Sequence, residues 1–502
     1  MLKSDNIDSF RNGDYPLEML PQTLRDAVVL TRYLGLQYLW IDALCIIQDS
    51  PEDWAAEAAR MKEVYGGATI TIAATGSKTS TDGMLKPRAI STPLCELHWT
   101  DSLRSKVFLR SSLSFWDTTM KREPLNTRGW TLQESMLSPR TLSFGTQQMT
   151  WECQELRVGE NGRPILPGER HRDKQFIQSL ATNRLSLVQR SKFKLARFSL
   201  QVMPSTHTIV PQSWELFHHA LYSRWYEIVN DFTGRNLTVG SDVLPALSGI
   251  ASAFHNLLDD HYCAGIWKGD LIRGLLWHRG RIQNHQRPLT ATTSRRLAEG
   301  HHVPSWSWAS IGGGRVFNAL AAEKTWQFIT VEEIARISKV ATTLRFDDPY
   351  GQTSDGFLDI VAPFCLSPEL SLYFDSTDKI FSSTPLGTSH LERRLQTEMT
   401  IDRFRDEFKQ QHKAFPGQSF AVIRLMKHSR SSDSNIETIG EIYMPEASFL
   451  VLETTGKTCE NYRRVGYFTV SVPMYPDPDD ENVVLLEEME SAKWPWKKVR
   501  IV

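Results

Sequence analysis

The stretch YLWIDALCIIQDSPEDWAAEAARMKEVYGGATITIAA, residues 38–74, decides the fold of this chain. Its apolar start, residues 38–41, predicts a strand. Ser50 followed by a proline predicts the start of a helix, which Gly66 ends. The segment TITIAA, residues 69–74, predicts the next strand. A strand, a helix and a strand with short connections indicate a crossover unit of a parallel sheet.

The flanking sequence extends this pattern in both directions. Apolar residues at helical spacing predict a helix over 21–35. A further short helix is expected at about 129–137, followed by strands at about 141–144 and 147–153. Together these elements predict an α/β domain with a parallel sheet over residues 1–155.

Composition excludes several classes of protein. The chain has 502 residues, enough for roughly two or three domains. Its net charge of −1 creates no overall field that favours nucleic acid or an anionic membrane. It has neither a membrane-spanning run of about 18 apolar residues nor an apolar signal segment. Six cysteines without metal-ligand spacing predict reduced thiols in a cytoplasmic protein that binds no metal.

The remainder of the chain predicts two further regions. Between residues 161 and 200 there are nine Lys or Arg and only two Asp or Glu. Because no nucleic-acid motif accompanies these charges, residues 156–210 are interpreted as a basic linker or insert. Residues 211–502 show helical patterns first and strand patterns later, which predicts a mixed α+β region.

Three segments together resemble the conserved blocks of the fungal heterokaryon incompatibility (HET) domain family. They are LWIDALCIIQD (39–49), MKEVYGGATITIAA (61–74) and NTRGWTLQESMLSPRTLSF (126–144). PSWSWAS (304–310) and neighbouring segments resemble the C-terminal companion region of long members. The residues that match the family motifs are Trp40, Asp42, Cys45, Gln48, Asp49, Tyr65, Ala68, Arg128, Trp130, Gln133, Glu134 and Arg140.

The resemblance implies a fold and a function. The family's domain has been likened to the flavodoxin-like fold of Toll/interleukin-receptor (TIR) domains. The family is associated with self/non-self recognition leading to regulated cell death. We therefore expect a signalling protein that acts through self-association or protein partners, without nucleic acid.

One conserved block of the family has no counterpart in this sequence. Members open with a strand and turn of the type Tyr-x-x-Leu-Ser-Tyr-x-Trp-Gly. In a flavodoxin-like order that strand is central, so its loss exposes two strand edges and apolar surface. Three explanations stay open: a misassigned start codon, a truncated inactive paralogue, or another segment in the strand's place.

The TIR likeness also implies an alternative activity, hydrolysis of NAD or a related nucleotide. Asp42, after the strand expected at 38–41, and Glu134, in an apolar helix, are the candidate catalytic carboxylates, since a carboxylate stabilises an oxocarbenium-like state. Arg128 is the candidate phosphate ligand. Each carboxylate also has a structural interpretation: Asp42 caps main-chain amides, and Glu134 pairs with Arg128 or Arg140. No cofactor is expected beyond a nucleotide substrate.

Three other polar residues of the opening stretch receive simpler interpretations. Cys45 is expected to pack as a small hydrophobic side chain. Asp49 is expected to favour the positively polarised start of the following helix. Gln48 has no role that the sequence explains.

Overall fold

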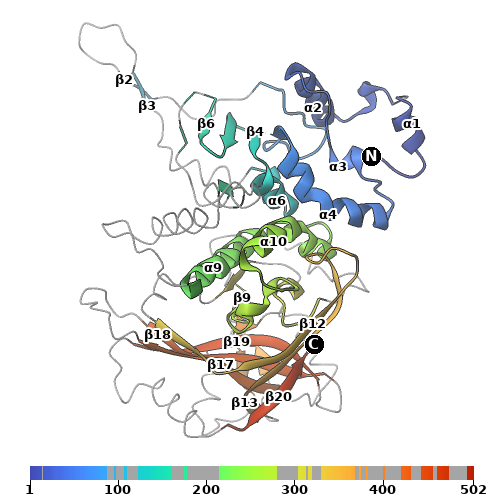
Figure 1. Cartoon of the computed structure of the whole chain (residues 1–502). Coiled ribbons are helices and arrows are strands. Elements are labelled where there is room, and N and C mark those ends of the chain that lie inside the picture. Colours follow the sequence, from blue (N-terminus) through green and yellow to red (C-terminus); the bar gives the residue numbers. More distant parts are fainter. Residues whose placement is uncertain are drawn as a thin grey trace. The chain divides into compact units, whose positions relative to one another are not determined.

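The chain is seen here as a computed structural model (Figure 1). The structure describes residues 1–13, 15–87, 95–97, 107–109, 123–160, 162, 164–165, 174–175, 177, 214–279, 303–311, 315–318, 329–367, 372–374, 380–382, 400–401, 420–430, 443–455, 461–473 and 494–502. Most of the basic stretch at 156–210 therefore lies outside the described residues. Unit 1 comprises Met1–Val188, Arg235–Thr238 and Pro245–Leu257, and unit 2 comprises Gln189–Gly234, Val239–Leu244 and Leu258–Val502.

The long helices of unit 1 begin where the sequence signals lie. α2 spans Gln22–Tyr33, and α4 spans Pro51–Gly67. The hydroxyl of Ser50 caps α4 by accepting a hydrogen bond from the main-chain N–H of Asp53 at 3.2 Å. The other helices are α1 (Ile7–Arg11), η1 (Leu17–Met19), α3 (Asp42–Cys45), η2 (Leu125–Thr127), α6 (Trp130–Leu137) and α10 (Pro245–Leu258).

The sheet of unit 1 is partly parallel. Its four strands lie in the order β1-β4-β5-β6, with bounds Thr71–Ala73, Arg140–Phe144, Met149–Cys153 and Arg157–Gly159. β1 pairs with β4 in parallel, whereas the other two pairs are antiparallel, so the parallel sheet that the sequence predicted is present only in part. The described strands therefore do not establish a flavodoxin-like order. β2 (Cys95–Leu97) and β3 (Val107–Leu109) form a separate antiparallel pair.

The two faces of this sheet have different chemistry. On one face Ile72 and Leu142, which lie opposite each other, pack against a core cluster that includes Ala27 and Leu30 of α2. Side chains alternate along a strand, so Thr71, Thr141 and Ser143 share the other face. α2 thus covers the apolar face and leaves a polar face with hydroxyl groups.

Residues 38–41 do not form the strand that their sequence predicted. The chain is extended up to Ile41 (φ −135°, ψ 126°) and then enters the single turn of α3. Among the described residues no strand pairs with this segment. Leu39 and Ile41 nevertheless pack against the same core as Ile72. An apolar run thus favours an extended, partly buried segment, but it does not supply the neighbour that makes a strand.

Unit 2 has a core rich in tryptophan. Trp225, in helix α9 (Trp214–Thr233), and Trp308 are both buried and donate indole hydrogen bonds to the carbonyl of Gly265, at 2.9 and 2.8 Å. Gly265 has φ +99°, and a Cβ there would lie 2.6 Å from the indole nitrogen of Trp308, so only glycine fits. The short elements of unit 2 are η3 (Gly240–Val243), β7 (Tyr262–Cys263), β8 (Ile266–Trp267), η4 (Lys268–Asp270), α11 (Leu271–Gly274), β9 (Trp277–Arg279), η5 (Trp308–Ser310) and β10 (Val316–Asn318).

Strands in the C-terminal part of unit 2 close into a ring. The pairings run β17–β18–β19–β20–β13 and return to β17, and only the β19–β20 pair is parallel. These strands span Phe420–Arg430, Tyr443–Thr454, Asn461–Pro473, Trp496–Ile501 and Thr353–Ser367. Three further strands pair with strands of the ring: β11 (Ile329–Glu333), β12 (Arg336–Leu344) and β16 (Thr400–Ile401). A separate pair consists of β14 (Leu372–Phe374) and β15 (Ile380–Ser382). Unit 2 therefore contains both helices and a β-rich part.

Candidate functional site

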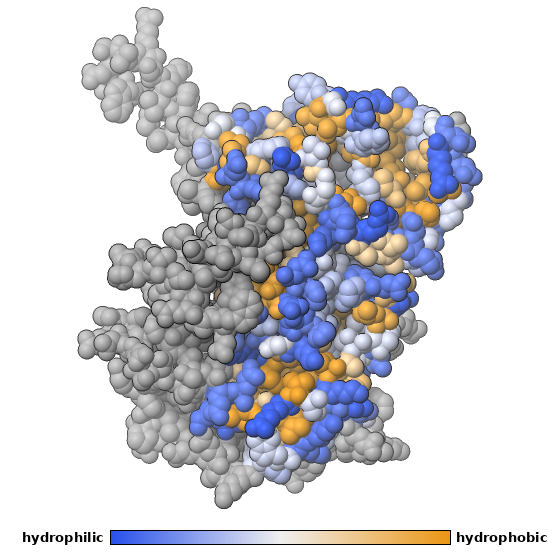
Figure 2. Space-filling view, viewed as in Figure 1, coloured by the Kyte–Doolittle hydropathy of each residue, from blue (hydrophilic) through white to orange (hydrophobic). Residues whose placement is uncertain are grey.

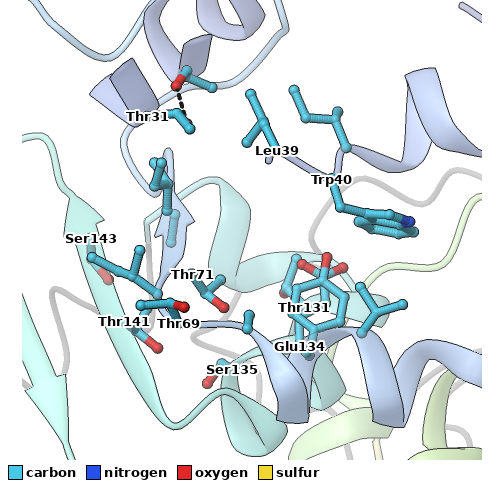
Figure 3. A pocket seen from close by; sticks show the side chains of 18 of the residues that line it. Thr31, Leu39, Trp40, Thr69, Thr71, Thr131, Glu134, Ser135, Thr141 and Ser143 are labelled. Atoms are coloured by element: carbon cyan, nitrogen blue, oxygen red, sulfur yellow. Dashed lines mark hydrogen bonds between the residues drawn. The ribbon is translucent and has the colours of Figure 1, made fainter. Parts of the chain in front are cut away.

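A cavity of about 670 Å³ lies beside the first strand of the sheet in unit 1. Figure 3 shows Leu39 and Trp40 across the cavity from Thr69 and Thr71, with Glu134 of α6 on the same side as Trp40. The cavity thus borders the extended segment, β1 and parts of helices α2, α4 and α6. It brings together parts of the chain that the sequence motifs marked separately.

Glu134 is the only charged residue of α6, and it lines this cavity. Its pKa is raised from 4.5 to about 7, first by burial and then by the negative charge of Asp42. The positive charge of Arg128 and a hydrogen bond from Tyr65 act in the opposite direction without cancelling the effect. Near neutral pH this carboxyl group therefore exchanges a proton, as a general acid or base must.

Tyr65, in the last turn of α4, makes direct contact with Glu134. Its hydroxyl donates a hydrogen bond to the carboxylate, and burial raises its own pKa well above the usual value. Its ring packs edge-on against Trp40, with ring centroids 5.9 Å apart. Tyr65 follows Trp54, Ala58 and Met61 at helical spacing and so lies on the apolar face of α4, a pattern that does not predict this hydrogen bond. The available signal was a tyrosine, not a phenylalanine, at the end of that face.

Asp42 and Arg128 both act on Glu134 through their charges. Asp42 is the first residue of α3 and is exposed, and its carboxylate accepts a hydrogen bond from the main-chain N–H of Ala43 at 2.7 Å. Arg128 directly follows η2 and is exposed. The structure therefore places the three proposed site residues in one electrostatic neighbourhood. Asp42 also has the main-chain contact that its structural interpretation required.

One known protein family covers the same part of the chain as this site. Residues 4–134 match the family described as Heterokaryon incompatibility protein (HET). This segment is a HET domain. The resemblance carried by the sequence motifs is thereby confirmed, and the domain relates the chain to heterokaryon incompatibility. No curated protein and no solved structure matched the chain.

Three motif residues of the HET domain have contacts that differ from expectation. Cys45 was expected to be packed, but it is exposed at the end of α3, and partial burial of its thiol raises the pKa. A raised pKa lowers the thiolate fraction, so nothing activates this thiol. Asp49 accepts hydrogen bonds from the main chain and hydroxyl of Ser4, at 2.9 and 3.2 Å, and so fastens the N-terminal segment. Gln48 donates to the carbonyls of Asp42 and Ile46, which closes the loop after α3.

The other motif residues of the HET domain hold its helices together. Trp130 of α6 packs edge-on against Trp54 of α4, with ring centroids 6.1 Å apart. The fully buried Gln133 accepts a hydrogen bond from the main-chain N–H of Gly249 in α10 at 2.7 Å. Arg140 donates to the carbonyl of Thr69 at 3.4 Å and forms no ion pair with Glu134 among the contacts of the described residues. Ala68 follows the end of α4 and lines the cavity.

The polar face of the sheet carries a buried cation that the sequence did not predict. Lys174 is 1% exposed and donates a hydrogen bond to the hydroxyl of Thr141 at 2.8 Å. It also forms an ion pair with Glu152 at 3.3 Å, and Arg157 approaches the same carboxylate at 3.4 Å. Lys174 lies in the basic stretch, where nothing in the sequence distinguishes it from its neighbours.

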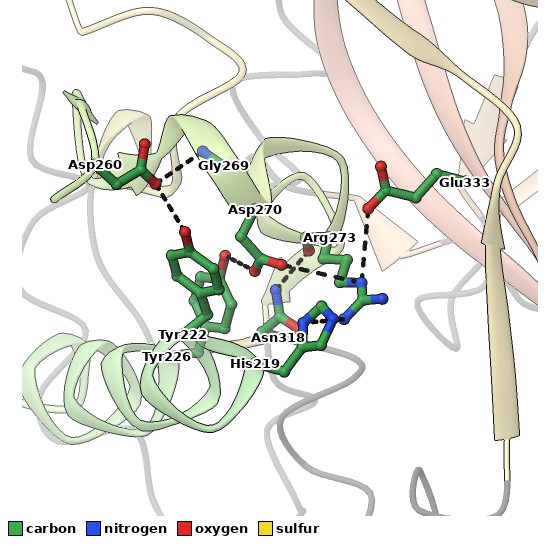
Figure 4. A network of polar contacts seen from close by, with 9 residues as sticks. All are labelled: His219, Tyr222, Tyr226, Asp260, Gly269, Asp270, Arg273, Asn318 and Glu333. Carbon is green, nitrogen blue, oxygen red and sulfur yellow. Dashed lines mark hydrogen bonds and ion pairs between the residues drawn. The ribbon is translucent and has the colours of Figure 1, made fainter. Parts of the chain in front are cut away.

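Unit 2 contains a polar network of its own (Figure 4). Asp270 is buried and accepts a hydrogen bond from the hydroxyl of Tyr226 at 2.7 Å. Burial raises the pKa of Asp270 to about 7 despite the nearby charge of Arg273. Arg273 also contacts His219 of α9 and forms a 3.7 Å ion pair with Glu333 of β11. The network therefore links α9, α11 and β11, as a structural connection does.

The described residues contain neither a candidate membrane span nor a candidate metal cluster. No helix in that part of the chain is both long enough and apolar enough to cross a membrane. No group of three or more His, Cys, Asp or Glu side chains that would suit a metal ion lies there either.

Proposed function

We propose that this protein acts in self/non-self recognition leading to regulated cell death, and that its HET domain acts through protein association. Large apolar side chains exposed on and after α2 carry this proposal: Val29 is 51% exposed, Tyr33 85% and Tyr38 89%. Val29 and Tyr33 are four residues apart and so share one helix face. Figure 2 shows hydrophobic residues at the surface of this part of unit 1, among hydrophilic ones. Exposed apolar surface of this kind is typical of protein contacts.

The test changes this helix face without changing the core. The double variant Val29→Glu/Tyr33→Glu places two charges on the contact surface, and both positions are exposed. We expect it to lose co-purification with the protein's partner, or with a tagged second copy, and to lose cell killing when expressed in a fungal host. Leu156→Glu is the matched control, because Leu156 is also an exposed apolar residue of unit 1, 46% exposed. Killing and association by the double variant at the level of the control would contradict the proposal.

A second candidate function is hydrolysis of NAD or a related nucleotide. The observation that favours it is Glu134 in the wall of a 670 Å³ cavity, with a pKa of about 7 and with Arg128 nearby. A carboxylate beside the ribose would stabilise the positive charge that develops when the N-glycosidic bond breaks. Arg128, whose charge acts on Glu134, would bind a phosphate.

Glu134→Gln separates the two candidates. The change removes the ionisable group and keeps the shape of the side chain and its contact with Tyr65. If the HET domain works by association, killing persists and purified protein shows no NAD turnover above background. If it works by hydrolysis, both killing and turnover disappear, as turnover would in an oxocarbenium mechanism that loses its carboxylate. Glu18→Gln, an exposed carboxylate outside the cavity, is the control.

A further inference from the structure

The first strand of the HET-domain sheet has one side without a neighbour. Within the described residues β1 pairs only with β4. A strand with one neighbour leaves alternate main-chain N–H and C=O groups pointing to its other side. All three residues of β1 are only half buried, although they lie against the core of unit 1. The free side of β1 faces the cavity.

The opposite wall of the cavity is an extended segment that also lacks a strand partner. The main chain of residues 37–40 makes no main-chain hydrogen bond to another described residue. Its side chains Leu39 and Ile41 nevertheless pack against the same core cluster as Ile72 of β1. Two stretches of main chain whose free sides have no partner among the described residues therefore border one cavity and share one core.

The size of the cavity matches a short piece of one strand. A strand residue takes about 3.3 Å along the strand, about 4.8 Å between strands and about 10 Å between packed layers, or roughly 160 Å³. The cavity of about 670 Å³ therefore has room for at most about four residues of extended chain. This length is close to that of β1, which has three residues.

The walls of the cavity also define the side chains that such a strand would carry. On the core side they are apolar, with Ala27, Leu39 and Ile72. On the other face of the sheet they carry hydroxyl groups, such as that of Thr71. A strand between them would alternate apolar and polar residues, because successive side chains point to opposite faces.

The charges around the cavity favour a basic residue in the strand. Glu63 lines the cavity and forms no ion pair with another described residue, and Glu134 lies in the same wall. Both lie near the C-terminal end of α4, where the helix dipole attracts cations. The cations on the polar face, Lys174 and Arg157, already interact with Glu152.

We infer that this cavity is a binding site for an extended segment of a partner protein, which adds a strand between residues 37–41 and β1. The segment has about four residues inside the cavity, alternates apolar and polar side chains, and carries a Lys or Arg at the end near Glu63. Main-chain hydrogen bonds to both walls supply affinity, and the two unlike walls supply specificity. The assignment rests on the proposed role in protein association and names the form that a partner takes.

The experiment uses the full chain and a synthetic peptide, Lys-Val-Thr-Val-Thr-Val, with blocked ends. We expect it to bind and to slow hydrogen exchange of the amides in residues 37–41 and 71–73 by about tenfold or more. A peptide of the same composition with its valines in one block should bind about tenfold more weakly. A peptide with proline in place of the first threonine should lose a similar amount of affinity, because proline has no N–H group to donate. Replacing Lys by Gln should weaken binding less than either of these changes.

A matched pair of protein variants locates the binding. Thr69→Trp places a large side chain at the cavity wall from an exposed position and should abolish peptide binding, whereas Thr81→Trp, at an exposed position away from the cavity, should not. Binding that Thr69→Trp leaves unchanged would overturn the inference. Slow hydrogen exchange of both segments in the protein without peptide would also overturn it, because residues of the chain itself would then fill the site. Loss of peptide binding when the protein forms a dimer would overturn it as well, because a second copy would then fill the site. None of these outcomes affects the Val29/Tyr33 test, so failure of the strand site and failure of the proposed function are distinguishable.

Discussion

Glu134 and Asp270 both have a raised pKa, but their surroundings differ. Asp270 is 3% exposed and accepts a hydrogen bond from Tyr226, with Arg273 beside it. Glu134 also has a tyrosine partner, but it borders a cavity. A partly buried carboxyl group that lines a cavity is the one able to meet a ligand or a partner's side chain. This difference makes Glu134, and not Asp270, the candidate functional residue.

The raised pKa of Glu134 predicts a pH-dependent loss of stability. The folded protein holds this proton up to about pH 7, whereas the unfolded chain releases it near pH 4.5. Folding is therefore opposed increasingly as the pH rises from 4.5 to 7, and the full loss is present above 7. Between pH 5 and pH 8, the free energy of unfolding of the unchanged protein should fall relative to that of Glu134→Gln by up to about 3 kcal/mol. Denaturant unfolding at both pH values measures this difference; a constant difference would show that Glu134 is ionised at pH 5.

Single polar residues were the least predictable part of the site. Trp40, Asp42, Tyr65 and Glu134 belong to motifs that the sequence displays, yet their mutual contacts depend on how α3, α4 and α6 pack. The roles of Asp49 and Gln48 depend on Ser4 and on two carbonyl groups, none of which a local pattern identifies. Residue type therefore suggests a candidate, and only tertiary contacts assign its partner.

At the scale of elements, Asp26 shows how α2 is fixed to the loop after β1. This residue is 6% exposed, and its carboxylate accepts hydrogen bonds from the main-chain N–H groups of Met84 and Leu85 at 2.7 and 3.0 Å. Burial acts to raise the pKa of Asp26, but these main-chain hydrogen bonds outweigh it and lower the pKa. Gly83 fits beside it with φ +72°, where a Cβ would lie 3.0 Å from the Asp26 carboxylate.

Asp26→Ala should therefore destabilise the HET domain by about 2–3 kcal/mol, because the buried N–H group of Met84 and the part-buried one of Leu85 lose their acceptor. The readout is the free energy of unfolding from denaturant titration at pH 7. Asp8→Ala in α1 is the control, since Asp8 is exposed and a surface change of this kind costs less than about 0.5 kcal/mol. Equal stability of the two variants would mean that water replaces the carboxylate.

Helices and paired strands of unit 1 were predictable because their signals are local. The cap at Ser50, the apolar face of α2 and the residues of β4 and β5 all lie within the segments that they define. The segment 38–41 differs because strand formation needs a neighbour, and no described strand occupies that place. This segment, which is extended but unpaired among the described residues, therefore marks the site where we expect the strand of a partner.

At the scale of the whole molecule, the ring of strands in unit 2 was not predictable from the sequence. Its pairings join residues far apart in the chain, such as β13 with β20 and with β17, and no local pattern specifies such partners. Arg464 of β19 illustrates how long-range contacts hold unit 2 together. Its side chain is 2% exposed, donates hydrogen bonds to the carbonyls of Leu275 and Trp277, and lies 3.5 Å from the centre of the Trp277 ring.

Loss of the Arg464 side chain should therefore unfold unit 2 more easily than loss of its neighbour. Arg464→Ala leaves two buried carbonyl groups without a donor and opens a space beside Trp277, which should cost about 3 kcal/mol or more. Arg463→Ala removes the same side chain from a half-buried position and should cost less than about 1 kcal/mol. Tryptophan fluorescence during denaturation reports on unit 2, because Trp225, Trp267, Trp277, Trp306 and Trp308 are all buried there. If the two variants unfolded at the same denaturant concentration, the buried arginine would be replaceable, and the tryptophan core alone would hold unit 2 together.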